Sequence, residues 1–114
     1  MDISTISEYE KDVKKYKKKF RTIEEDIEIV KAILKIKPDQ RPPFSQRIEG
    51  LGIGTCIIKI RKIACRSLKG RGVDSGFRLV YAYFPEIPKI VLVELYFKAD
   101  QEMENRERIL KHFK

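Results

Sequence analysis

The spacing of apolar residues changes once along this 114-residue chain, and that change constrains the fold more than any other feature. In residues 7–36 apolar side chains recur every three to four positions, which is the spacing of amphipathic helices. In residues 56–98 they alternate with polar side chains or run continuously, which is typical of strands. Since no helical pattern separates the strand segments, we expect neighbouring strands to pair antiparallel. The order predicts an α+β domain in which most helices precede the sheet.

The helical part divides into two helices that should form an antiparallel hairpin. Ser7 and Thr22 each begin a potential capping box, with a glutamate three residues later. The predicted apolar stripes are Tyr9, Val13, Tyr16 and Phe20 in the first helix and Ile23, Ile27, Val30 and Leu34 in the second. Pro38 ends the second helix because its ring cannot continue the hydrogen-bonding pattern. The lysines around the first stripe are interpreted mainly as a solvated face.

A Pro- and Gly-rich stretch, residues 37–55, indicates a long loop before the strands. Three strand segments follow at residues 56–66, 76–84 and 89–98, and residues 2–6 could add a fourth strand. Asp100 can begin a last helix, in which acidic residues come early and basic residues late, as the helix dipole prefers. A single domain should therefore cover residues 1–114.

Positive charge is concentrated in one part of the chain. The sequence has 25 basic and 17 acidic residues, and its formal net charge of +8 favours a polyanionic partner. Residues 59–78 contain seven basic side chains and one acid, Asp74, which gives a net charge of +6. The seven are Lys59, Arg61, Lys62, Arg66, Lys69, Arg71 and Arg78. An excess of this size in so short a segment is more than solubility requires, so a merely solvated face is the weaker interpretation.

The predicted sheet would place several of these charges on one open face. Lys59 and Arg61 have the same parity in their strand, and Arg78 points away from the apolar face of the next strand. Lys69 and Arg71 lie between glycines in the connection, where a nucleic-acid backbone could approach closely. Tyrosines that could stack on bases, depending on the face they take, are Tyr81, Tyr83 and Tyr96. We therefore predict a basic trough about as wide as a nucleic-acid strand.

Several other kinds of site and environment are excluded. Cys56 and Cys65 form no disulfide framework, and with His112 they give no zinc-ligand spacing. The longest apolar run, residues 79–84, is far shorter than a membrane-spanning helix requires. The first residues also lack the pattern of a signal peptide. We therefore expect a cytoplasmic protein that uses no metal or cofactor and binds no membrane.

If the trough cleaves RNA, a metal-independent reaction is expected. The ribose 2′-OH would attack the adjacent phosphate while a base removes its proton, cations stabilise the transition state and an acid protonates the leaving 5′-oxygen. His112 is the only histidine, so a pair of catalytic histidines is excluded. Lysines, arginines or a tyrosine would have to transfer the protons, and such a site would be slow on free RNA.

Four short segments resemble the RelE/ParE toxin superfamily. They are Lys59-Ile-Arg61-Lys62, Ser67-Leu-Lys69-Gly70, Ser75-Gly-Phe-Arg78-Leu-Val-Tyr81 and Leu95-Tyr-Phe-Lys98. The resemblance implies an α+β fold with a helix hairpin packed on a curved antiparallel sheet of three to four strands and a C-terminal helix. It also implies a translation inhibitor that cuts mRNA in the ribosomal A site, with a cognate antitoxin, the ribosome and mRNA as partners.

Carried over by position, the resemblance implies catalytic roles for Lys69, Arg71 and Arg78. The residues expected to bind RNA are Lys59, Arg61, Lys62, Arg66, Tyr96 and Lys98. Two other functions remain open for the same fold. One is a ParE-like protein that inhibits DNA gyrase by contact, and the other is a non-catalytic RNA-binding member.

Overall fold

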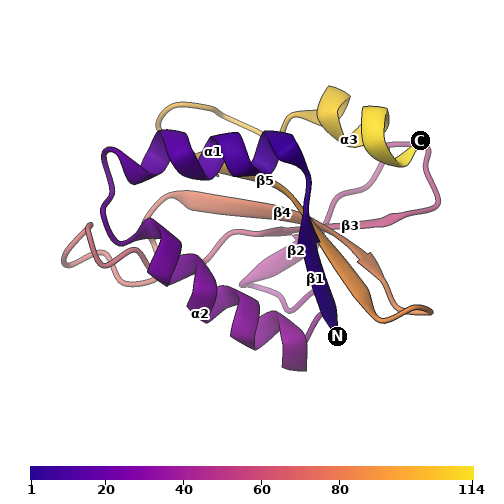
Figure 1. Cartoon of the computed structure of the whole chain (residues 1–114), viewed down its shortest axis with the longest axis horizontal. Coiled ribbons are helices and arrows are strands. Elements are labelled where there is room, and N and C mark those ends of the chain that lie inside the picture. The colour runs from indigo at the N-terminus through magenta and orange to yellow at the C-terminus, as the bar shows by residue number, and fades with distance from the viewer.

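Five strands form one sheet in the computed structural model, which describes residues 1–114. The elements in chain order are β1 (Asp2–Thr5), α1 (Ser7–Lys17), α2 (Ile23–Ile36), β2 (Ser45–Arg47), β3 (Cys56–Ile60), β4 (Phe77–Phe84), β5 (Lys89–Phe97) and α3 (Arg106–Phe113), as Figure 1 shows. The strand order is β1-β5-β4-β3-β2, and every pair is antiparallel except β1 and β5, which are parallel. The predicted α+β class is confirmed, and none of the three helices is long and apolar enough to cross a membrane.

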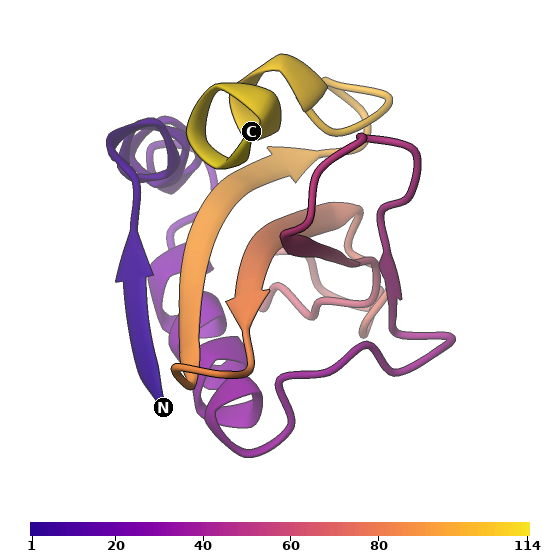
Figure 2. The same ribbon diagram turned by 90° about the vertical axis from the view of Figure 1, so that its right-hand side faces the viewer.

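The sheet is curved and has helices on both faces (Figure 2). The hairpin of α1 and α2 buries both predicted apolar stripes against one face, where all eight of their residues belong to or pack against the larger core cluster. Ile109 of α3, which is fully buried, packs with Val80, Val93 and Tyr96 against the opposite face. The sheet is therefore a layer between two apolar cores.

A β-bulge in β5 contributes to this curvature. Val80 pairs with Glu94, but the next residue of β4, Tyr81, pairs with Leu92, so that Val93 is an extra residue. Strict alternation would place Val93 with Leu95 on the face of the helix hairpin. The bulge instead places Val93 in the smaller core, beneath α3.

The structure differs from the sequence prediction in the end of one strand and in the presence of an additional strand. The strand expected over residues 56–66 ends at Ile60, and residues 61–76 form a loop apart from an isolated bridge between Ile63 and Asp74. The long loop before it contains the short strand β2, which extends the sheet to a fifth strand. Both differences arise at the edge of the sheet, where pairing depends on the partner segment more than on local residue pattern.

Neither predicted capping box forms. The Ser7 hydroxyl donates a hydrogen bond to the neighbouring Glu8, and the Thr22 hydroxyl donates to Asp26 and lies 2.8 Å from the Ser67 hydroxyl. Thr22 therefore links α2 to a distant loop instead of capping the helix.

The last helix also begins later than Asp100. The Asn105 side chain accepts a hydrogen bond from the Arg108 N–H, which caps α3 there. Upstream, the buried Glu94 carboxylate accepts hydrogen bonds from the Asn105 N–H at 2.8 Å and from the Gln101 side chain at 2.6 Å. These bonds hold the preceding segment in a non-helical conformation.

Candidate functional site

A basic cleft of about 270 Å³ opens where the loop between β3 and β4 meets the start of β4 and the end of β5. Its lining consists of Arg61, Lys62, Arg71, Asp74, Gly76, Arg78 and Lys98. Five of these residues are basic and one is acidic, and none is hydrophobic. The cleft is therefore suited to an anion and not to an apolar ligand.

The turn at Ser75 and Gly76 builds this cleft. The buried Ser75 hydroxyl donates a hydrogen bond to the Ile63 carbonyl at 2.5 Å and accepts one from the Phe77 N–H at 3.1 Å, which ties the loop to β4. Gly76 has a φ of 97°, and its carbonyl accepts a hydrogen bond from the Lys98 N–H at 2.8 Å. The turn thus brings the loop, the start of β4 and the residue after β5 to one place.

The cleft contains more positive charge than its own acid can neutralise. Lys62 Nζ lies 2.5 Å from Asp74 Oδ1, and this hydrogen bond is the main reason that the pKa of Asp74 is lowered. Arg61 donates to the Gln46 side chain at 3.1 Å. The side chain of the half-buried Arg78 makes one hydrogen bond, to the Phe77 carbonyl at 3.4 Å.

Four of the five cations have no carboxylate within ion-pair distance: Arg61, Arg71, Arg78 and Lys98. Charges left without a counter-ion favour an anionic ligand such as a phosphate group.

Four of the nine residues predicted for the site do not line the cleft. Lys59 forms an ion pair with Glu104 at 2.8 Å, and both side chains are largely buried. Arg66 pairs with Asp26 and Glu25 of α2, where it fastens the loop to that helix. Lys69 is exposed in the loop without a hydrogen-bonded or ion-paired partner. The fourth is Tyr96.

The expectation that Tyr96 is an exposed stacking platform is wrong. Its side chain is 2% exposed and packs in the smaller core, opposite Arg78 in the register of β4 and β5. Burial raises its pKa to about 12, with a further contribution from Glu104 and Glu94, so the hydroxyl stays protonated at neutral pH. Tyr81 is fully buried as well, and its hydroxyl donates to the Pro38 carbonyl at 2.7 Å.

Two cleft residues were not predicted as site residues. Asp74 appeared in the sequence only as the single acid of a basic stretch, and Gly76 only as the residue between Ser75 and Phe77. An acid that interrupts a basic run, and a glycine in a Ser-Gly pair before a strand, are the signals that could have identified them.

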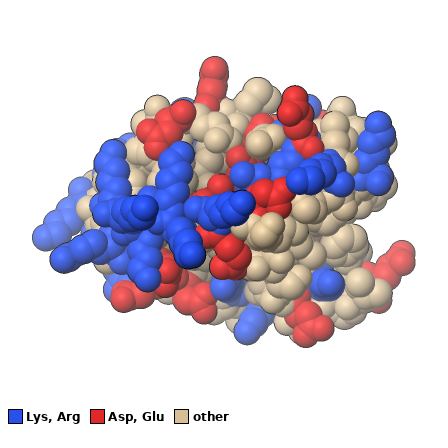
Figure 3. All heavy atoms as spheres, turned by 45° about the horizontal axis from the view of Figure 1, so that its top comes forward, with Lys and Arg blue, Asp and Glu red and all other residues tan.

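A second basic surface lies on α1. Lys11, Lys14, Lys15, Lys17 and Lys18 gather there, and Lys and Arg side chains crowd that end of the molecule in Figure 3. Among these lysines only Lys17 forms an ion pair, with Glu24 at 3.0 Å. The end of α1 packs on the start of β4, since the rings of Tyr16 and Phe77 are 5.2 Å apart. The lysine face and the cleft therefore lie at the same end of the sheet.

Comparison with known proteins identifies the fold. No family model matches the chain, and a search of curated proteins finds no match. Among solved structures, the chain is similar to the archaeal RelE–RelB complex from Pyrococcus horikoshii OT3, with a TM-score of 0.59 and 15% sequence identity over 85% of this chain and 93% of the matched chain. The chain has a RelE-like fold, which confirms the fold expected from the four sequence segments.

Proposed function

We propose that this protein is the toxin of a toxin–antitoxin pair and that it inhibits translation by cutting mRNA on the ribosome. The observation that carries the proposal is the basic cleft, in which Arg71, Arg78 and Lys98 have no carboxylate partner. The RelE-like fold supports the class of protein. The matched structure is a complex of RelE with RelB, and we extend that arrangement to a cognate antitoxin for this chain.

The cleft offers positive charge at neutral pH. Arginine does not lose its proton in proteins, so Arg71 and Arg78 would bind the scissile phosphate and stabilise the charge that develops on it. Lys62 and Lys98 can donate a proton to the leaving 5′-oxygen. In this scheme the attacking group is the ribose 2′-OH, and the bond between phosphorus and the 5′-oxygen breaks.

Removal of the 2′-OH proton is the weak step of this scheme. Asp74 is the only carboxylate in the cleft, and its ion pair with Lys62 lowers its pKa, which makes it a poor base. We therefore expect slow cleavage of free RNA. Cleavage should depend on the ribosome, which would hold the mRNA strand in the conformation that brings the 2′-OH into line.

Mapping mRNA 3′ ends in a cell-free translation reaction tests this function. Cuts within codons should appear with the wild-type protein only when ribosomes are present. Arg78→Ala and Arg71→Ala should each lower the cleavage rate by about 10²- to 10³-fold, the usual effect of removing one group that stabilises transition-state charge. Lys69→Ala should have a smaller effect, because Lys69 does not line the cleft.

Arg47→Ala is the matched control, since Arg47 is an exposed arginine of β2 outside the cleft. It should cleave like the wild type. Full-length mRNA with undisturbed translation would refute the nuclease, and inhibition of gyrase supercoiling would then identify the ParE-like alternative. Binding of RNA without any cut would indicate a non-catalytic member.

A further inference from the structure

An acidic segment, residues 98–105, connects β5 to α3 over the face of the sheet that α3 covers (Figure 2). We call this segment the strap. It contains three acids, Asp100, Glu102 and Glu104, and one base, Lys98, which lines the basic cleft. A segment with this charge beside a basic cleft can compete with an anionic ligand for the nearby cations.

The strap crosses three strands of the sheet. Lys59 of β3, Val80 of β4 and Glu94 of β5 are direct neighbours in the register and form one row. Glu94 holds the strap at one end of this row, through the Asn105 N–H at 2.8 Å. At the other end, the Glu104 carboxylate accepts a hydrogen bond from Lys59 Nζ at 2.8 Å. The strap therefore spans the face from β5 to β3 and covers a cation there.

Lys59 is next to the cleft although it does not line it. Gln46 of β2 lies directly opposite Lys59, and its side chain accepts a hydrogen bond from Arg61, which does line the cleft. Arg78 precedes Val80 by two residues in β4, so it lies on the same face about 7 Å along the strand. Lys59 would thus extend the line of Arg61 and Arg78 by about one nucleotide of a bound strand.

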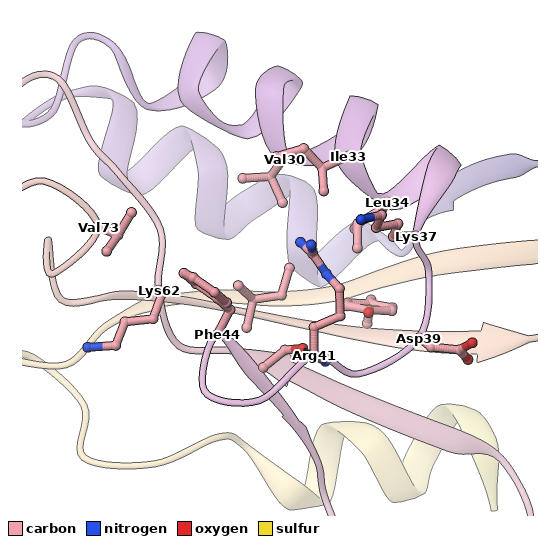
Figure 4. A pocket seen from close by; sticks show the side chains of 12 residues that line it. Val30, Ile33, Leu34, Lys37, Asp39, Arg41, Phe44, Lys62 and Val73 are labelled. Atoms are coloured by element: carbon pink, nitrogen blue, oxygen red, sulfur yellow. Dashed lines mark hydrogen bonds between the residues drawn. The ribbon is translucent and has the colours of Figure 1, made fainter.

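Two ion pairs in this region differ in their access to water. The side chains of Lys62 and Asp74 in the cleft are 35% and 70% exposed, and Lys62 points away from Phe44 (Figure 4). Such a pair is weak in water, so it leaves Lys62 available to a ligand. The side chains of Lys59 and Glu104 are only 15% and 3% exposed. A ligand that bound Lys59 would first have to separate these two buried charges.

The strap can open while α3 stays in place. Within the strap only Glu104 is buried, so no apolar side chain anchors this segment. The helix has anchors of its own, because Ile109 packs in the smaller core and Arg108 pairs with Asp12 of α1 at 2.7 Å. The strap is held closed by polar contacts, of which the ion pair of Glu104 is one. A phosphate can replace a carboxylate in such a pair, since both accept charge-assisted hydrogen bonds.

We propose that Lys59 is a second phosphate subsite, which Glu104 keeps closed to free nucleic-acid strands. The Glu104 carboxylate takes the place of the phosphate next to the one that Arg61 and Arg78 bind. A free strand occupies the cleft alone, whereas a strand held by the ribosome meets Lys59 at a much higher effective concentration and displaces Glu104. The inference rests on the proposed function, because it assumes that the cleft binds RNA.

Fluorescence anisotropy with a short DNA oligonucleotide, which lacks the 2′-OH and is not cleaved, tests the subsite. Glu104→Gln removes the competing charge and should bind the oligonucleotide at least about tenfold more tightly than wild type, the usual value of a hydrogen bond to a charged group. Its salt dependence should become steeper by about 0.7 in log–log terms, for one further phosphate.

Glu102→Gln is the matched control, because Glu102 is an exposed acid of the strap that forms no ion pair. It changes the net charge by the same amount as Glu104→Gln and should bind the oligonucleotide like wild type.

The double variant Lys59→Gln/Glu104→Gln identifies the group that provides the gain. It should lose the gain in affinity, because the subsite no longer has its cation. It leaves no charge of the buried pair without a partner, so it also serves if Glu104→Gln alone does not fold. In the cell-free translation reaction it should cut mRNA at least about tenfold more slowly than wild type, since Lys59 can no longer bind the strand on the ribosome.

Several results would overturn the subsite. They are equal affinities of Glu104→Gln and wild type, an equal gain in Glu102→Gln, and a gain that persists in the double variant. Cleavage by the double variant at the wild-type rate would also overturn it. Oligonucleotide binding that Arg71→Ala does not weaken would instead refute the cleft, and with it the proposed function.

Discussion

Gly76 is the residue on which the shape of the basic cleft depends most directly. Its φ of 97° lies in the left-handed region that side chains with a Cβ rarely adopt. A Cβ added there would lie 3.1 Å from the Phe97 ring, whose centroid is 4.9 Å from that of Phe77 and 5.2 Å from that of Phe20. Because the Phe97 ring packs against both of these rings, which are also in contact with each other, it cannot easily move away.

Gly76→Ala should therefore destabilise the fold more than the same change at Gly70. Gly70 also has a positive φ, of 80°, but nothing lies within 4 Å of an added Cβ. Gly70→Ala should cost only the backbone strain, about 1–2 kcal/mol of unfolding free energy. Gly76→Ala should cost about 1–3 kcal/mol more, because the added methyl group overpacks against Phe97. Urea unfolding measures both values. An equal loss of unfolding free energy in the two variants would show that the Phe97 ring moves aside without an energetic cost.

At the scale of elements, α3 is fastened to α1 by charged side chains. Arg108 Nη1 donates to Asp12 at 2.7 Å and to the Val93 carbonyl at 3.0 Å. Glu8 accepts from His112 at 2.9 Å and from Lys111 at 3.3 Å. Together with the buried Ile109, these contacts hold a helix of only eight residues on the sheet.

The contact between Glu8 and His112 should make the free energy of unfolding fall as the pH is lowered through the acid range. The hydrogen bond from His112 is the main cause that lowers the pKa of Glu8 from 4.5 to about 2. Because the pKa of Glu8 is lowered in the folded protein, its carboxylate stabilises the folded state fully above pH 4.5. This stabilisation is lost as the pH falls toward 2. In Glu8→Gln the urea midpoint should fall less steeply over this interval than in wild type.

Glu10→Gln is the control for this measurement, because Glu10 lies in the same helix and makes no side-chain hydrogen bond or ion pair. It should follow the wild-type curve. Identical curves for all three proteins would show that the contact with His112 does not stabilise the docked helix.

The sequence predicted the elements that depend on periodicity and missed those that depend on distant partners. The stripes from Tyr9 to Leu34 and the strand from Phe77 to Phe84 were correct, because burial on one face imposes a period on the chain itself. The strand β2, the bulge at Val93 and the start of α3 at Arg106 were not predicted. The strand β2 and the bulge depend on pairing with a neighbouring strand, and Glu94 of β5 holds the segment before α3.

At the scale of the whole molecule, the site was only partly predicted, because it too depends on contacts between residues that are distant in the sequence. The sequence located the basic stretch. Five of the cations predicted for the site, four from this stretch and Lys98, gather in one cleft. It could not show that Lys59 would be neutralised by Glu104 or Arg66 by Asp26, because these pairs are separated by 45 and 40 residues. Net charge is a property of the sequence, but the charge available to a ligand is a property of the fold.

The dependence of nucleic-acid binding on salt should therefore follow the free cations and not the total charge. Binding to a single strand loses affinity with salt at a slope of about −0.7 in log–log terms for each phosphate that is neutralised. The five cations of the cleft give a slope no steeper than about −3.5 for a short DNA oligonucleotide. Arg71→Ala should make the slope shallower by about 0.7, and Arg47→Ala should leave it unchanged.

Fluorescence anisotropy over a range of KCl concentrations measures these slopes. A slope much steeper than that of the cleft alone would mean that the lysine face of α1 also binds the strand, since it lies at the same end of the sheet. Lys14→Gln/Lys18→Gln would then reduce the slope while Arg71→Ala reduced it independently. If Arg47→Ala and Arg71→Ala lowered the slope equally, binding would follow net charge, and the cleft would have no special part in it.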